Sequence, residues 1–185
     1  RGCDLDFGDT RRTSWDKRDR TMAAKCSEFL RQAGHKGKLI LWAHNAHVAT
    51  LNSQRRKSLG AHLKDKLGSK FVNFALLFNN GSFHAVEGGN NCGGTIKRFR
   101  FAKAAVGSYE YFFAKLGISP AIIDLRVIPR NRLFRNWYTN TYTVREVGAI
   151  YDPKLTKTYD HRIDLPTKFN GIVWVNTITP SRLLL

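Results

Sequence analysis

The chain has 185 residues, of which 42% are apolar, with ordinary numbers of glycine and proline. This length and composition allow one globular domain with a real hydrophobic core and exclude a disordered chain. The net charge of +17 is compatible with binding to nucleic acid, to an anionic membrane surface or to an acidic substrate. It is equally compatible with the solvated faces of an ordinary soluble protein. We favour this second interpretation, because no recognition motif accompanies the basic clusters at residues 11–12, 17–20, 55–57, 97–103 and 126–135.

The first third of the chain predicts two helices and one buried strand. Apolar residues recur at helical spacing over residues 19–32, and Gly34 follows as a stop signal. Residues 38–43 form a short apolar run with the length of one buried strand. Residues 57–67 predict a second helix, because leucines stand four apart and Gly68 follows them.

The rest of the chain alternates between strands and helices. We expect a strand at 71–78, a turn at Asn79-Asn80-Gly81 and a return strand at 82–86 that completes a hairpin. A glycine-rich loop follows at 88–94 and lacks the lysine of a phosphate-binding motif. Ser108 begins a helix at 108–116, and strands are expected at 121–127, 144–151 and 171–176, whereas 95–101 is ambiguous between strand and loop. This order favours an α/β fold, with a mainly parallel sheet, flanking helices and one hairpin, as part of a larger domain.

Chemically useful side chains follow the predicted strand at 38–43. His44, Asn45 and His47 stand at the point where this strand should end, and ligands of α/β proteins bind beyond the carboxyl ends of strands. Histidine transfers protons near neutral pH, so His44 and His47 are candidate catalytic residues and Asn45 a candidate substrate contact. Alternatively, one imidazole is a buried structural group. A metal site would need a third ligand that the sequence does not offer nearby, so we expect no metal and no cofactor.

The charged triplet Arg18-Asp19-Arg20 precedes or begins the first predicted helix. Asp19 can be an ordinary helix cap. Alternatively, an arginine of this triplet reaches the site, where its planar fork binds a carboxylate or supports a developing oxyanion. We expect Arg20 to contact substrate in this second case. Aromatic residues interleave with basic ones over residues 132–142, a pattern that suits base stacking, an apolar ligand pocket or simple core packing.

The number and spacing of the cysteines indicate in which cellular environment the chain folds. The three cysteines are scattered, odd in number and without C-x-x-C spacing, which argues against a disulfide framework and a structural zinc site. No apolar run has the length of a membrane span, and no signal peptide opens the chain. We therefore expect free thiols in a reducing, cytoplasmic environment.

Several segments together resemble the erythromycin esterase family. The most specific is LILWAHNAHV at residues 39–48. It is supported, in the order of the family, by RDRTMA (18–23), SLGAHLKDKLG (58–68), ALLFNNGSFHA (75–85), GSYEYFFAKLG (107–117), IIDLR (122–126), VREVGAIYDP (144–153) and FNGIVWVNTITP (169–180).

The resemblance implies a metal-independent hydrolase that cleaves carboxylic esters, macrolide lactones among them, through an activated water molecule. It thereby implies a small-molecule ester substrate and a link to antibiotic resistance. It also implies that His44 and His47 belong to the active-site cleft, one as general base and one as support for the oxyanion.

The family's amino-terminal motif with a further His and a Glu has no counterpart here. We therefore expect residues 1–185 to be the carboxyl-terminal part of one such domain. We also expect it to lack a carboxylate that orients the imidazole and to be inactive alone. The main alternative is a basic nucleic-acid-binding protein, and a third is a His-based metal hydrolase. The sequence does not indicate an oligomeric state.

Overall fold

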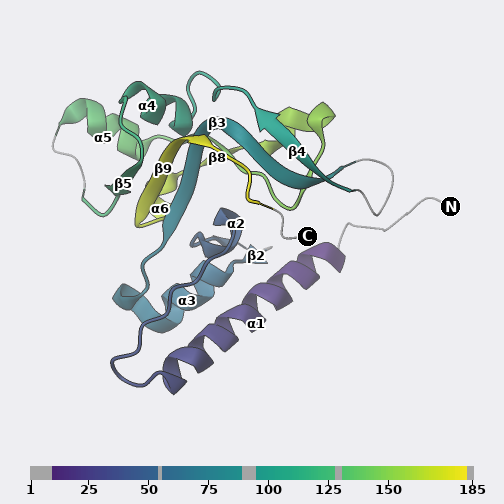
Figure 1. The fold of residues 1–185 in the computed structure, drawn as a ribbon. Coiled ribbons are helices and arrows are strands. Elements are labelled where there is room, and N and C mark those ends of the chain that lie inside the picture. The colour runs from purple at the N-terminus through teal and green to yellow at the C-terminus, as the bar shows by residue number, and fades with distance from the viewer. Residues whose placement is uncertain (1–9, 54–55, 89–94, 128–130, 183–185) are drawn as a thin grey trace. The chain divides into compact units, whose positions relative to one another are not determined.

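The computed structural model describes residues 10–53, 56–88, 95–127 and 131–182, and the chain divides into two compact units (Figure 1). Leu5–Ala75 and Thr167–Asn170 form one of them, which we call the helical unit. Leu76–Pro166 and Gly171–Leu185 contribute to the other, which we call the sheet unit. Among the described residues, none of the helices combines the length and the apolar character of a membrane span.

The helical unit is built on two packed helices, α1 (Thr10–Gln32) and α3 (Leu59–Leu67), which run side by side in Figure 1. Their contact buries Ala23 and Cys26 of α1 against Leu59 and Leu63 of α3. The remaining elements of this unit are short: α2 (Asn45–Val48), η1 (Gly68–Lys70) and an antiparallel pair formed by β1 (Asn52–Ser53) and β2 (Arg56–Lys57). Both predicted helices are confirmed.

The start of α1 changes the interpretation of Asp19. The helix begins nine residues before the predicted start, so Asp19 lies inside it. The alternative of Asp19 as a helix cap is therefore wrong. The side chain is buried, because residue 19 continues the inward face that carries Ala23 and Cys26.

The predicted buried strand at residues 38–43 is absent. This segment has no strand assignment, and the side chains of Ile40 and Trp42 are 93% and 82% exposed. A strand is stable only when a neighbouring strand completes its backbone hydrogen bonds. None of the described strands pairs with this segment.

The sheet unit contains a five-stranded sheet in the order β4-β3-β9-β5, with β7 pairing to β3. The strands are β3 (Phe74–Glu87), β4 (Ile96–Phe101), β5 (Ala121–Asp124), β7 (Ile150–Tyr151) and β9 (Gly171–Ile178). A separate pair joins β6 (Tyr142–Arg145) to β8 (Asp160–Ile163). The helical elements are α4 (Tyr109–Lys115), α5 (Arg132–Thr139), η2 (Pro153–Tyr159) and α6 (Leu165–Lys168).

The α/β class is confirmed, but the sheet is mostly antiparallel and not mainly parallel. β3 pairs antiparallel with β4, β5 pairs antiparallel with β9, and the β3–β7 pair is parallel. The expected turn at Asn79-Asn80-Gly81 is also wrong, because β3 runs straight through it for 14 residues. Position 81 within this strand requires glycine, because of its backbone conformation and a close neighbour. Its φ of 131° suits glycine, and a Cβ there would lie 2.1 Å from the carbonyl oxygen of Ile178.

The core of the sheet unit is rich in aromatic side chains. Phe83 and Phe101 stack with ring centroids 4.9 Å apart, and Tyr151 packs edge-on against Phe83 at 5.2 Å. Trp174 of β9 is buried against Phe113 of α4. The predicted helix at 108–116 corresponds to α4, and the predicted strands at 121–127 and 171–176 correspond to β5 and β9. All three are confirmed, with somewhat different ends. Cys3, Cys92 and residues 89–94 of the predicted glycine-rich loop lie outside the described residues.

Candidate active site

The two candidate histidines belong to a single helical turn, α2. His44 is the N-cap residue, and its Nδ1 accepts a hydrogen bond of 3.2 Å from the backbone N–H of Ala46. This cap satisfies one of the donors that a helix leaves open at its start. His47 lies three residues later within the same turn. The segment at residues 44–47 thus encodes the local structure as well as the imidazoles.

Close packing against α3 holds this short helix in place. A Cβ on Gly60 would lie 2.1 Å from the carbonyl oxygen of Val48, so only glycine allows α3 to approach the end of α2 this closely. The buried amide of Asn73 donates a hydrogen bond of 2.7 Å to the same carbonyl oxygen. A helix of four residues is not stable alone. These contacts therefore fix where the His47 ring stands.

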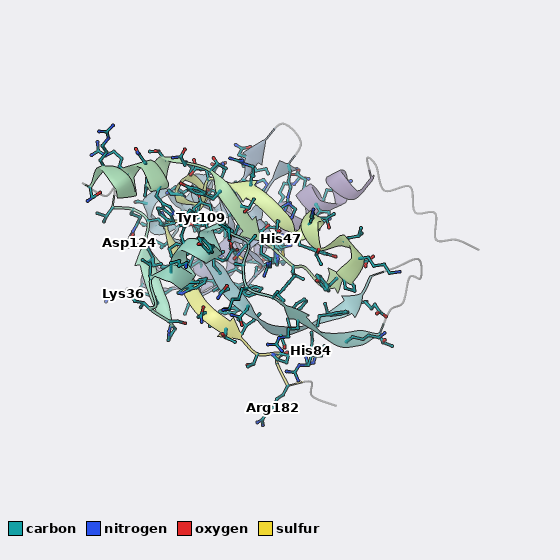
Figure 2. The ribbon with its side chains drawn as sticks, turned by 90° about the horizontal axis from the view of Figure 1, so that it is seen from above. Lys36, His47, His84, Tyr109, Asp124 and Arg182 are labelled. Atoms are coloured by element: carbon teal, nitrogen blue, oxygen red, sulfur yellow. The ribbon has the colours of Figure 1, made fainter. Side chains whose placement is uncertain are left out.

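His47 is bonded to a buried carboxylate on α1. The His47 Nδ1–H donates to Oδ1 of Asp19 over 2.6 Å, and the backbone N–H of Leu59 donates to Oδ2 over 3.2 Å. Asp19 is 0% exposed, whereas the side chain of His47 keeps 13% exposure. The carboxylate thereby selects the tautomer of neutral His47 that carries its lone pair on Nε2. Figure 2 labels His47 among the side chains.

An aromatic ring and two guanidinium groups surround this pair. The indole of Trp15 stacks on the His47 ring with centroids 5.0 Å apart and planes inclined by 11°. Arg18 lies 4.5 Å and Arg56 4.7 Å from the centroid of the Trp15 ring, distances at which cations are attracted to the π-face. Arg18 also donates to Nε2 of His47 over 2.9 Å, and Arg56 lies 3.8 Å from Oδ2 of Asp19.

These neighbours set the proton affinity of His47. Burial lowers its pKa below the ordinary value, and the positive charges of Arg18 and Arg56 lower it further. The Asp19 charge and the hydrogen bond from His47 to it act in the opposite direction. The net lowering keeps His47 neutral at neutral pH, and a neutral imidazole is the form that accepts a proton from water.

The expected site residues take different places. His47 contacts Asp19, Arg18 and Trp15, while His44 caps the helix that carries His47. Asn45 is buried at the start of α2, and Arg20 is exposed on α1. The arginine of the triplet that reaches His47 is Arg18. The catalytic roles of His44 and His47 and the substrate-binding roles of Asn45 and Arg20 stay predictions.

The expectation that the chain lacks a carboxylate to orient the imidazole is wrong, because Asp19 supplies it. The partner was missed because it comes from a helix 28 residues upstream. A signal was nevertheless present. Asp19 stands four residues before Ala23 on the stripe that continues to Cys26, and an acidic residue on the buried face of a helix needs a partner. Trp15, four residues earlier, follows the same spacing but is itself exposed.

The described part of the chain holds no group of three or more His, Cys, Asp or Glu side chains placed to bind a metal ion.

Comparison with known proteins places the chain in a family. The sequence matches the erythromycin esterase family over residues 5–178. The chain belongs to the erythromycin esterase family. Among curated proteins, no significant match is found.

Two solved structures share the fold of this erythromycin esterase family chain. One is a Bacillus cereus protein, with 22% identity and a TM-score of 0.74, and the match covers 92% of this chain and 40% of that protein. The other is described as a succinoglycan biosynthesis protein, with 19% identity and a TM-score of 0.64, and the match covers 80% of this chain and 35% of that protein. The chain therefore spans less than half of the length of either structure.

Proposed function

We propose that this chain provides part of the active site of a carboxylic ester hydrolase of the erythromycin esterase type, with His47 as general base. The observation that carries the proposal is the bond between Nδ1 of His47 and the buried Asp19 at 2.6 Å. Membership of the erythromycin esterase family supports it. Nothing in the comparisons favours the nucleic-acid-binding alternative.

The geometry around His47 suits the activation of water. Asp19 fixes the imidazole and leaves the lone pair on Nε2, which removes a proton from water as its oxygen attacks the ester carbonyl carbon. The tetrahedral intermediate carries a negative charge on the former carbonyl oxygen. Its collapse breaks the bond to the alcohol oxygen, which takes the proton back from Nε2. The carboxylic acid product then loses its proton to solvent.

Cations near His47 support the charged intermediate. Arg18 lies within 2.9 Å of His47, and a guanidinium stabilises an oxyanion through charge and hydrogen bonds together. His44 is our candidate for a second contact to the oxyanion, with Asn45 and Arg20 as substrate contacts. We propose a small-molecule ester as substrate, a macrolide lactone among the candidates. A reducing, cytoplasmic location fits the free thiol of Cys26.

The direct test is ester hydrolysis by the intact protein and its His47→Gln variant. We expect the variant to lose at least about a hundredfold in kcat/KM toward an aryl ester or a macrolide, which is typical of a lost general base. His35→Gln is the matched control, because His35 is exposed in a turn of the helical unit. Retention of hydrolysis by a folded His47→Gln variant would show that His47 is not the base.

A further inference from the structure

The nitrogen that must act as base is already occupied by a charged donor. Because the Nδ1–H of His47 donates a hydrogen bond to Asp19, Nε2 carries the lone pair and accepts a hydrogen bond of 2.9 Å from the Arg18 guanidinium. Arginine keeps its proton at any physiological pH. Water therefore does not reach the lone pair while Arg18 holds this position.

Among the described residues, two guanidinium groups and one carboxylate act on the charge of His47, and burial lowers its pKa. Arg18 donates to Nε2 of His47, and Arg56 lies beside the Asp19 carboxylate. Arg56 has further contacts that hold it, since it donates to the backbone carbonyl of Ala46 over 3.0 Å. Arg18 is exposed, and its other close partner is the face of Trp15. Of these two arginines, Arg18 is the more accessible to a ligand.

An oxyanion is a stronger partner for Arg18 than the neutral imidazole. A carboxylate or phosphate accepts two parallel hydrogen bonds from a guanidinium, with opposite charges on the two sides. The imidazole accepts one bond and carries no charge. The Arg18 guanidinium also lies 4.5 Å from the centroid of the Trp15 ring, where the π-electrons attract it.

We propose, on the basis of the function proposed above, that Arg18 is an anion-operated gate on His47. A carboxylate or phosphate group of the substrate draws the guanidinium of Arg18 away from Nε2 and thereby frees the base. The favoured substrates are then esters that carry an oxyanion group beside the ester bond, whereas esters without one, such as a macrolide lactone, react more slowly.

The gate has a measurable consequence for the titration of His47. Asp19 raises the pKa of His47, and Arg18 and Arg56 lower it. When an anion draws Arg18 away, one lowering influence is removed and a negative charge is brought near the ring. Both changes raise the pKa of His47, so the anion uncovers the base and also strengthens it.

The test follows the pKa of His47 in this chain by NMR of the imidazole Cε1–H, with His47→Gln to assign the signal. The probes are acetate and inorganic phosphate, each compared with chloride at equal ionic strength. We expect the pKa to rise by about one unit with at least one probe, and the stronger probe distinguishes a carboxylate from a phosphate ligand. Arg18→Gln should raise the pKa in chloride and abolish the response to both probes. Arg31→Gln, an exposed change in the last turn of α1, should keep the response.

Hydrolysis assays separate failure of the gate from failure of the proposed function. We expect the intact protein to prefer 4-nitrophenyl hemisuccinate, which carries a carboxylate, over 4-nitrophenyl acetate, and Arg18→Gln to lose that preference. An unchanged His47 pKa with both anions, or an equal response in Arg18→Gln, would overturn the gate even if His47→Gln abolishes hydrolysis. A shift of the pKa by anions without any hydrolysis dependent on His47 would instead leave Arg18 as an anion site and refute the esterase proposal.

Discussion

Asp19 and Glu110 are both buried carboxylates on helices, one in each compact unit, and they differ in the donors that surround them. Asp19 in α1 accepts from His47 on one oxygen and from the Leu59 N–H on the other. Glu110 in α4 is only 1% exposed, and its Oε1 accepts from the Arg145 N–H over 2.7 Å. Its Oε2 has no hydrogen-bond partner among the described residues.

The difference separates two uses of a buried carboxyl group. Burial raises the pKa of Glu110 from its ordinary 4.5 to about 7, and the backbone donor and Arg145 only partly oppose this. Glu110 therefore holds a proton in mildly acidic solution. Asp19, with donors at both oxygens, orients an imidazole instead. Glu110, with one oxygen lacking a hydrogen-bond donor among the described residues, is thus a group that makes folding depend on pH.

The largest effect is expected from Asp19→Ala. The change leaves two buried donors, His47 Nδ1–H and Leu59 N–H, without an acceptor, and should lower the free energy of unfolding of the helical unit by about 3 kcal/mol. Urea denaturation followed by far-UV circular dichroism measures this loss.

Asp19→Asn provides the matched comparison, because its amide oxygen can still accept one of these bonds. We expect a smaller loss of stability, together with a further decrease in the pKa of His47, since the raising influence of the Asp19 charge is gone. An unchanged His47 pKa in Asp19→Asn would show that the carboxylate does not tune the imidazole.

The second prediction concerns the contribution of Glu110 to the pH dependence of the free energy of unfolding. Its pKa in the folded chain, about 7, lies above the ordinary 4.5, so the folded state keeps a proton that the unfolded chain loses. The stabilising contribution is complete below about pH 4.5 and is lost as the pH rises through 7, by about 3 kcal/mol in all. Glu110→Gln should flatten this decline, as measured by urea denaturation at several pH values.

Asp124 offers a control carboxylate in the same unit. It is exposed on β5 and labelled in Figure 2, and its bonds with Arg126 lower its pKa to about 2. Asp124→Asn should therefore leave the decline between pH 4.5 and 8 as it is in the unmodified chain. If the free energy of unfolding no longer fell with pH in Asp124→Asn, or still fell fully in Glu110→Gln, Glu110 would not be the cause of the decline.

Both regions show which features the sequence determines locally. The start of α4 was predicted from Ser108, which caps it, whereas α3 begins two residues after its predicted start, behind the cap Ser58. The absence of a strand at 38–43 was not predictable, because pairing depends on a partner strand far along the chain, and apolar character alone does not supply one. The expected turn at 79–81 failed for a related reason. Gly81 lets the backbone of Ile178, almost a hundred residues away in the sequence, pack directly against β3.

The candidate site likewise has one part that is local in the sequence and one part that depends on distant segments. The motif at residues 44–47 is visible in the sequence, since α2 is formed by consecutive residues. Its partners Trp15 and Asp19 come from α1, and Arg56 comes from β2. Spacing within the chain does not reveal which helix face meets which loop. Only the inward position of Asp19, on the stripe that carries Ala23 and Cys26, indicated a partner.

The smallest effect tests whether a cap can tune the neighbouring carboxyl group. Ser108→Ala removes the acceptor for the Tyr111 N–H and should cost about 1 kcal/mol, as lost caps do. The Ser108 side chain also lowers the pKa of Glu110, so its loss should raise that pKa and move the decline in stability to higher pH. Ser58→Ala removes the corresponding cap of α3 and should lower stability without moving the decline, because Ser58 lies in the other unit. A decline that stays in place in Ser108→Ala would mean that the Ser108 side chain does not contribute to the pKa of Glu110.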